Sequence, residues 1–111
     1  MTSPDTIFHK IIRREIPATI AHEDGDVIAI HDIHPKANTH VLFIPKQFLA
    51  SIASIDPSTE HIPGMLIAKA KKFAQEKGID GYKLQFNVGA GGGQEVMYIH
   101  LHFLSDIKIK N

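Results

Sequence analysis

The chain of 111 residues contains no cysteine. Disulfide bridges and thiolate chemistry are therefore excluded. A surplus of charge of either sign is also lacking, because twelve basic side chains balance twelve acidic ones. Without a broad electrostatic field to attract nucleic acid or an anionic membrane, the protein is expected to act on a small molecule.

Long apolar runs are missing as well. No run approaches the roughly 20 residues that a membrane-spanning helix needs. The first six residues have neither the basic region nor the long apolar segment of a signal peptide, so we expect a cytoplasmic protein. The length fits a single domain, residues 1–111, and no repeat or low-complexity tract divides it.

Two histidines, one residue apart, lie in an otherwise apolar run near the C-terminal end. Side chains alternate between the faces of a β-strand, so Tyr98, His100 and His102 should share one face. A neutral imidazole has a lone pair that can attack phosphorus or bind a metal, and it can carry a proton near neutral pH. The pair is therefore a candidate site, although two histidines on the solvated face of an edge strand would give the same pattern.

A glycine-rich segment, residues 87–94, directly precedes the histidines. Glycine can adopt positive φ and lets backbone N–H groups come close to an anion. The segment suggests a phosphate held beside imidazole, although plain hairpin connections are also rich in glycine. It matches neither GxxxxGK[ST] nor GxGxxG before a helix, which disfavours the common nucleotide-binding folds.

The alternation of apolar residues and turn signals predicts an α+β domain on an antiparallel sheet. Five strands are expected, at residues 18–23, 27–31, 40–44, 82–88 and 97–104. The first two strands should form a hairpin across the turn at residues 24–26.

A short helix is expected near the N-terminus, with Ser3 as its cap and Pro4 at its first position. Its apolar stripe consists of Ile7, Phe8, Ile11 and Ile12. Pro17 ends or follows this helix.

A longer helix should open at Asp56 and run to Lys77, with Gly78 as its stop. Pro63 falls inside this span, so we expect a kink there or a helix that starts again near Ile62. The apolar stripe, which should form core or a dimer interface, consists of Met65, Leu66, Ala70 and Phe73.

Three blocks, residues 7–17, 31–46 and 92–102, resemble in the same order the histidine triad (HIT) family, and within it the Hint branch of nucleoside phosphoramidases. This resemblance implies a homodimer in which two five-stranded sheets join into one continuous ten-stranded sheet. It implies a small purine nucleotide as substrate, no cofactor and no metal.

The resemblance also implies roles for individual residues. His100 matches the nucleophile that attacks the α-phosphorus, His102 matches a histidine near the leaving group, and His40 supports both from a neighbouring strand. Asp32 matches the acceptor for the ribose hydroxyls. The base pocket maps onto Ile7, Phe8, Ile16, His31 and Ile33. The phosphate loop maps onto Asn87, Gly93, Gln94, Glu95 and Val96. The remaining histidines with no counterpart, expected at the surface, are His9, His22, His34 and His61.

One departure from the family pattern concerns the first histidine of the triad, which is Tyr98 here. A phenol can donate or accept one hydrogen bond but stays neutral near pH 7. We expect its hydroxyl to replace an imidazole link to His40, with catalysis retained but slower, so that Tyr98→His should raise turnover. A second departure is the short C-terminal end, residues 105–111, which leaves substrate selectivity open.

Three functions are therefore considered. The first is a hydrolase that cleaves the P–N bond of nucleoside 5′-phosphoramidates, of the AMP-amine or AMP-lysine type, through a nucleotidyl-histidine intermediate. The second is a catalytically weakened nucleotide-binding or sensing protein, because of Tyr98. The third is a zinc protein in which His100 and His102 are ligands together with a third residue.

Overall fold

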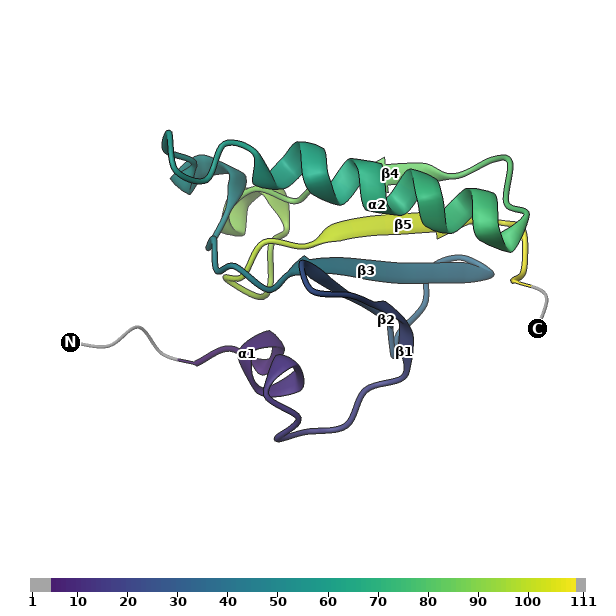
Figure 1. The fold of residues 1–111 in the computed structure, drawn as a ribbon, viewed down its shortest axis with the longest axis horizontal. Helices are drawn as coiled ribbons and strands as arrows, with labels where there is room; N and C mark the ends of the chain where they lie inside the picture. The colour runs from purple at the N-terminus through teal and green to yellow at the C-terminus, as the bar shows by residue number, and fades with distance from the viewer. Residues whose placement is uncertain (1–4, 110–111) are drawn as a thin grey trace.

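A computed structural model gives the fold of residues 5–109. Five antiparallel strands form one sheet in the order β1-β2-β3-β5-β4. The strands are β1 (Ile20–Glu23), β2 (Val27–His31), β3 (Thr39–Pro45), β4 (Lys83–Gln85) and β5 (Leu101–Ser105). The long helix α2 (Ile62–Lys77) covers one face of the sheet, and the short helix α1 (Ile7–Ile12) lies on the other (Figure 1). The α+β class and the five-stranded antiparallel sheet with one long and one short helix are confirmed.

The hairpin of β1 and β2 is held by its turn. The Asp24 carboxylate accepts hydrogen bonds from the backbone N–H groups of Asp26 (2.8 Å) and Val27 (3.0 Å). Burial opposes the charged form of Asp24, but these bonds and those from Lys69 and His22 outweigh it and lower the pKa of the carboxyl. The Lys69 ammonium lies 2.9 Å from the same carboxylate, so the turn is tied to α2.

The last two strands are shorter than predicted. β4 covers only Lys83–Gln85, and β5 begins at Leu101 rather than at residue 97. The backbone N–H of Ile99 donates to the Leu49 carbonyl at 2.7 Å, outside the sheet. The segment that enters β5 is therefore held by a loop and not by a neighbouring strand.

The short helix begins at Ile7, and the expected cap and first residue, Ser3 and Pro4, lie outside the described residues. Thr6 is the N-cap, because its hydroxyl accepts from the backbone N–H of His9 at 3.3 Å. The ring Nδ1 of His9 accepts in return from the Thr6 backbone N–H at 3.0 Å, which completes a capping box.

The long helix begins at Ile62, the alternative start that Pro63 suggested, and not at Asp56. Pro63 is tolerated in the first turn because its missing N–H would have no partner within the helix there. The Asp56 carboxylate instead holds a separate turn, with bonds to Ser58 and Thr59. Gly78 ends the helix at φ 70°, as predicted.

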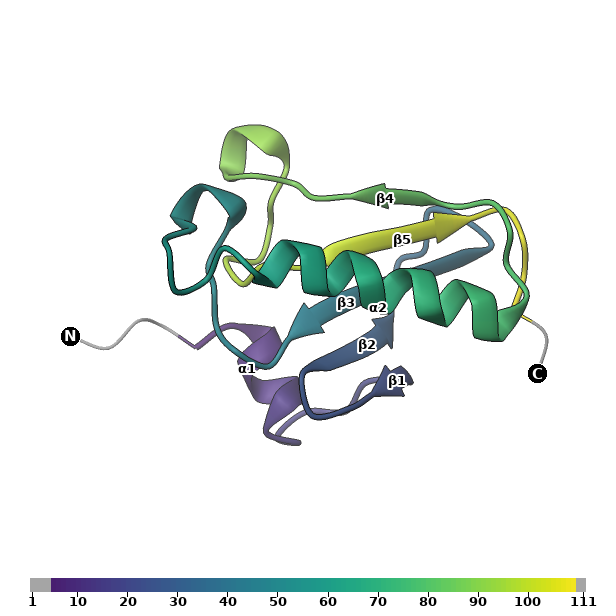
Figure 2. The ribbon, with the colours of Figure 1, turned by 45° about the horizontal axis from the view of Figure 1, so that its top comes forward.

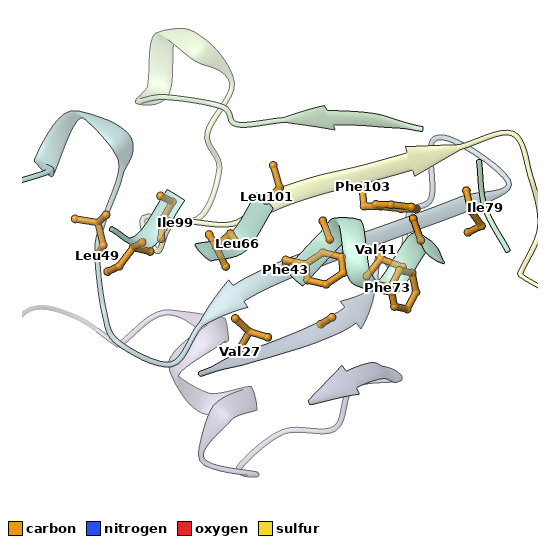
Figure 3. Packing of buried hydrophobic residues seen from close by; sticks show 14 residues of the cluster. Val27, Val41, Phe43, Leu49, Leu66, Phe73, Ile79, Ile99, Leu101 and Phe103 are labelled. Carbon is orange, nitrogen blue, oxygen red and sulfur yellow. The ribbon is translucent and has the colours of Figure 1, made fainter. Parts of the chain in front are cut away.

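The main core lies between α2 and the sheet (Figure 3). Phe73 of α2 packs edge-on against Phe43 of β3 and Phe103 of β5, with ring centroids 5.5 Å apart in both pairs. Three residues of the predicted stripe, Leu66, Ala70 and Phe73, are buried in this core, and Met65 packs against it. The expectation that the stripe could be buried against a second copy is wrong, since its own sheet already covers it.

A second apolar cluster lies on the opposite face and includes Phe8 and Ile11 of α1. It is completed by Ile28, Ile30, Leu42, Ile44 and Tyr98. His102 pairs with Leu42 across β5 and β3, so it shares this face of the sheet. Figure 2 shows β1 and β4 as the two edges of the sheet, with α1 under the end at which β3 finishes. Neither helix in the described part of the chain combines the length and the apolarity that crossing a membrane requires.

Candidate active site

His100 is held in one tautomer by the backbone. Its ring Nδ1 lies 2.8 Å from the carbonyl oxygen of Tyr98, which can only accept, so Nδ1 carries the proton. Nε2 therefore keeps its lone pair. Burial lowers the pKa of His100, although the Tyr98 carbonyl and the charges of Asp32 and Glu95 act in the other direction. The imidazole is thus neutral at pH 7 and can act as a nucleophile.

His40 and His102 form a hydrogen-bonded pair, and the backbone N–H of Lys36 determines which ring nitrogens of the pair carry protons. The N–H of Lys36 donates to His40 Nδ1 at 3.1 Å, so the proton of neutral His40 is on Nε2. This Nε2 lies 3.0 Å from Nδ1 of His102 and donates to it. The proton of neutral His102 must then be on its own Nε2, at the far end of the pair.

Both members of this pair are neutral at pH 7. Burial lowers the pKa of His40. Burial, with the nearby His100 and His40, lowers the pKa of His102 to about 4. The pair thus holds no extra proton at pH 7 unless a negative charge arrives beside it.

Asp32 directly follows β2 and reaches the histidines from there. Its Oδ2 lies 3.6 Å from His40 Nε2, and its backbone N–H donates to the His40 carbonyl at 2.9 Å. Its other carboxylate oxygen accepts from the backbone N–H of His34 at 2.8 Å. Asp32 therefore forms a turn and also presents a carboxylate oxygen at the site.

The glycine-rich loop has the backbone geometry that its composition predicts, since Gly89 (φ 69°) and Gly93 (φ 85°) are in the left-handed region. Gln94 is buried and braces the loop. Its side chain accepts from the Gly89 N–H at 2.9 Å and donates to the carbonyls of Ala50 (2.7 Å) and Val96 (3.0 Å).

Asn87 braces the same loop by donating to the Gly93 carbonyl at 3.2 Å. A Cβ at Gly93 would come within 3.3 Å of this amide. Gln94 and Asn87 thus shape the loop, and the side-chain amide of Gln94 is fully engaged in doing so. The predicted contact of Asn87 with phosphate stays a prediction. Glu95 is exposed, and Val96 packs partly against the second apolar cluster.

The Tyr98 side chain does not make the expected link to His40. Its hydroxyl donates to the Pro45 carbonyl at 2.6 Å, with a longer contact of 3.3 Å to the carbonyl of Lys46. Burial raises the pKa of the phenol to about 12. The link was wrongly predicted because β3 and β5 bring His40 directly to His102, so no bridge is needed.

The residues expected around a base differ in their exposure. Phe8 is buried and its ring lies edge-on to His100, with centroids 5.0 Å apart. Ile16 is partly buried, whereas Ile7 and Ile33 are 47% and 82% exposed. Two of these apolar side chains are therefore not core residues and are available to a ligand.

His31 does not lie where the family resemblance placed it. It pairs with Val41 across β2 and β3, and its side chain lines a cavity of about 560 Å³ with Phe73 and Lys77 of α2. This cavity is on the face opposite to His102. The side chain of His31 therefore lies away from Asp32, its neighbour in the chain.

The other histidines lie mostly as predicted. His34 and His61 are exposed, and His22 is half-buried, with its Nε2 in a hydrogen bond to the Asp24 carboxylate at 2.9 Å. His9 is not a simple surface residue, because its ring packs against Phe48 and Tyr98. The Lys36 amide was missed entirely. Nearly every residue has a backbone N–H, so no sequence pattern could have revealed its role.

Comparisons with known proteins agree with this geometry. Residues 5–110 match the family model described as Scavenger mRNA decapping enzyme C-term binding. The chain is 45% identical over 102 residues to the purine nucleoside phosphoramidase of Escherichia coli K12, covering 90% of this chain and 86% of that protein. It is 42% identical to the solved HIT family hydrolase of Legionella pneumophila, with a TM-score of 0.87 and 96% of each chain covered. The chain belongs to the HIT family.

A histidine triad protein of Clostridium difficile is also similar, at 38% identity and a TM-score of 0.88, covering 100% of this chain and 98% of that chain. The protein is thus a HIT hydrolase whose fold matches its relatives over nearly its whole length. In this HIT protein, His40, His102 and Asp32 converge on one face, with His100 beside them. Tyr98 contributes its carbonyl to the site and its phenol to the core.

Proposed function

We propose that this HIT hydrolase cleaves the P–N bond of purine nucleoside 5′-phosphoramidates, of the AMP-amine and AMP-lysine type. The observation that carries the proposal is the His100–Tyr98 hydrogen bond of 2.8 Å, which leaves Nε2 of a buried imidazole unprotonated. The name of the similar Escherichia coli protein, purine nucleoside phosphoramidase, supports this choice of substrate.

In the first step, the lone pair of His100 Nε2 forms a bond to the α-phosphorus, and the bond from phosphorus to the amine breaks. The departing nitrogen takes the bonding electrons and needs one proton. Binding of the negatively charged phosphate favours the protonated form of His102 and so brings this proton to the His40–His102 pair. His102 then gives the proton from Nε2 to the amine.

In the second step, water attacks the nucleotidyl-histidine on His100. The oxygen of water forms a bond to phosphorus as the P–Nε2 bond breaks, and the electron pair returns to Nε2. The neutral His40–His102 pair accepts the proton that water loses. The products are the free amine and a nucleoside monophosphate, and one proton has cycled through the pair.

Three further parts of the site suit the nucleotide. The Asp32 carboxylate, beside the histidines, can accept hydrogen bonds from both ribose hydroxyls. The exposed side chains of Ile7 and Ile33 offer apolar surface to a purine. The glycine-rich loop of residues 89–93 lets backbone groups come close to the phosphate.

The geometry gives less support to the other two functions. Loss of turnover would follow if Tyr98 had broken a link to His40, but His40 contacts His102 directly at 3.0 Å. One possible ligand atom from each of Asp32, His40 and His102 lies within 4.8 Å of the others, which is close enough to hold a metal ion. His100, one of the two zinc ligands considered above, is not in this group. The Lys36 N–H faces Nδ1 of His40, which leaves the proton on Nε2, the atom that would have to bind the zinc.

The experiment that tests the proposal is mass spectrometry of protein mixed with an AMP-amine and stopped with base, because a phosphohistidine bond is labile in acid. We expect an AMP adduct that maps to His100 and disappears as the amine is released. The variant His61→Ala, at an exposed histidine, should form the same adduct. Turnover of the substrate with no adduct at any time after mixing would contradict the proposed intermediate.

We also propose a twofold homodimer joined through β4. This strand is an edge of the sheet and is only three residues long, and an exposed edge is a ready surface for pairing with another chain (Figure 2). Tyr82 beside it is 37% exposed and stacks on Phe103, with centroids 4.7 Å apart. Pairing of two β4 strands would give the continuous ten-stranded sheet.

Sedimentation at micromolar concentration should therefore show a species of about 25 kDa, twice the 12.3 kDa of one chain. Because α2 is already covered by its own sheet, this dimer depends on the β4 edge. A stable, active species of 12.3 kDa at the same concentration would contradict it.

A further inference from the structure

Tyr98 forms hydrogen bonds both through its side-chain hydroxyl and through its backbone carbonyl. Its hydroxyl donates to the Pro45 carbonyl, at the end of β3, at 2.6 Å. Its own carbonyl accepts from Nδ1 of His100 at 2.8 Å. Tyr98 lies before the start of β5, and its carbonyl shares a peptide plane with the Ile99 N–H, which donates to the Leu49 carbonyl at 2.7 Å. This backbone bond and the Tyr98 side chain, rather than the sheet, therefore hold the carbonyl.

The Tyr98 ring is enclosed by aromatic side chains. Phe8, His9 and Phe48 surround it in edge-on contacts, with centroid distances of 6.3, 4.8 and 5.0 Å. Only 1% of the residue is exposed. Phe8 also lies against His100, so the same cluster that holds the phenol contacts the imidazole.

We propose that Tyr98 is a positioning residue for His100, in which the hydroxyl bond to Pro45, together with the backbone bond from Ile99 to Leu49, fixes the carbonyl that holds the nucleophile in its Nδ1–H tautomer. A backbone carbonyl exists at this position with any residue, but its direction depends on what anchors the segment. Here two bonds anchor it, the backbone bond from Ile99 to Leu49 and a side-chain bond from Tyr98 that reaches 53 residues back along the chain. The role in catalysis rests on the proposed function, whereas the role in setting the tautomer does not.

This interpretation reverses one expectation from the sequence. Tyr98→His was expected to raise turnover by restoring a link between His40 and the triad. His40 already contacts His102, and an imidazole is too short to fill the aromatic cluster and also reach the Pro45 carbonyl. We therefore expect Tyr98→His to lower turnover.

The test compares Tyr98→Phe with Tyr82→Phe, a matched control at an exposed tyrosine on the opposite face of the sheet. Nitrogen-15 NMR of the histidine rings reports which nitrogen of His100 carries the proton. We expect a single Nδ1–H tautomer in the parent protein and in Tyr82→Phe, and a mixture of both tautomers in Tyr98→Phe. The kcat of Tyr98→Phe should fall on the order of tenfold, with little change in KM.

A Tyr98→Phe protein that keeps the single Nδ1–H tautomer and normal kcat would overturn the inference. If that variant does not fold, 4-fluorophenylalanine at position 98, which fills more of the space of the phenol but cannot donate a hydrogen bond, should show the same mixture. An unchanged tautomer there would overturn the inference too. If the parent protein has no phosphoramidase activity, the proposed function fails, but the tautomer measurement still tests the role of Tyr98.

Discussion

His100→Ala is expected to reduce the turnover of an AMP-amine by roughly a thousandfold or more, because it removes the atom that attacks phosphorus. Nε2 of His100 has a lone pair that a fixed hydrogen bond on Nδ1 keeps available. Binding of AMP should stay within a few-fold of the parent protein, since the proposed base and ribose contacts come from other residues. Steady-state kinetics and titration calorimetry give the two values.

The matched control is His61→Ala, which removes an exposed histidine at the start of α2 and should leave both quantities unchanged. Circular dichroism would verify that both variants are folded. Near-normal rates in His100→Ala would rule out nucleophilic catalysis by this residue. Loss of AMP binding together with turnover would instead indicate that His100 acts mainly in binding.

The second large effect is expected from His102→Gln, which removes the group that passes a proton to the leaving amine. General acid–base catalysis is typically worth about a hundredfold to ten-thousandfold, and we expect a loss in that range for an alkylamine leaving group. An aromatic amine is a better leaving group and needs less help from a proton donor. The loss of turnover for a substrate with an aromatic amine should therefore be clearly smaller in the same variant.

This dependence on the leaving group separates proton transfer from simple damage to the site. Kinetics of both substrates with the parent protein, His102→Gln and the control His22→Gln give the comparison. His22 bonds to Asp24 in the hairpin and lies with Phe73 on the α2 side of the sheet, opposite to His102. Equal losses for the alkylamine and the aromatic amine would contradict the acid–base role of His102.

The sequence correctly predicted those turns and helix ends that depend on interactions between residues close together in the chain. The β1–β2 hairpin depends on Asp24, whose carboxylate bonds to the amides of the turn that follows it. The end of α2 depends on Gly78, which takes a positive φ that other residues avoid. The strand boundaries near residues 82 and 97 were less accurate, because a strand continues only where a neighbour pairs with it.

The same distinction applies to the candidate site. Residue types and their spacing were enough to predict a site at His100 and His102, and the structure brings His102 next to His40. The role of the glycine-rich loop in binding phosphate stays a prediction. Alternation of side chains also separates neighbours, and this was the reason for the error at His31, which lies on the opposite face from the site. A match of residue types in a motif does not reveal which face a side chain occupies.

The resemblance of three sequence blocks indicated the family, short-range periodicity indicated the α+β class, and both are confirmed. The side chains that carry the chemistry stay a prediction from the same blocks. Protonation states and hydrogen-bond partners depend instead on how distant segments fold together. Pairing of β3 with β5 brings His40 to His102 across 62 residues, and the Lys36 amide then assigns every proton in that pair. Tyr98 likewise bonds to Pro45 and not to His40, since a hydrogen bond depends on distance in space and not on separation along the chain.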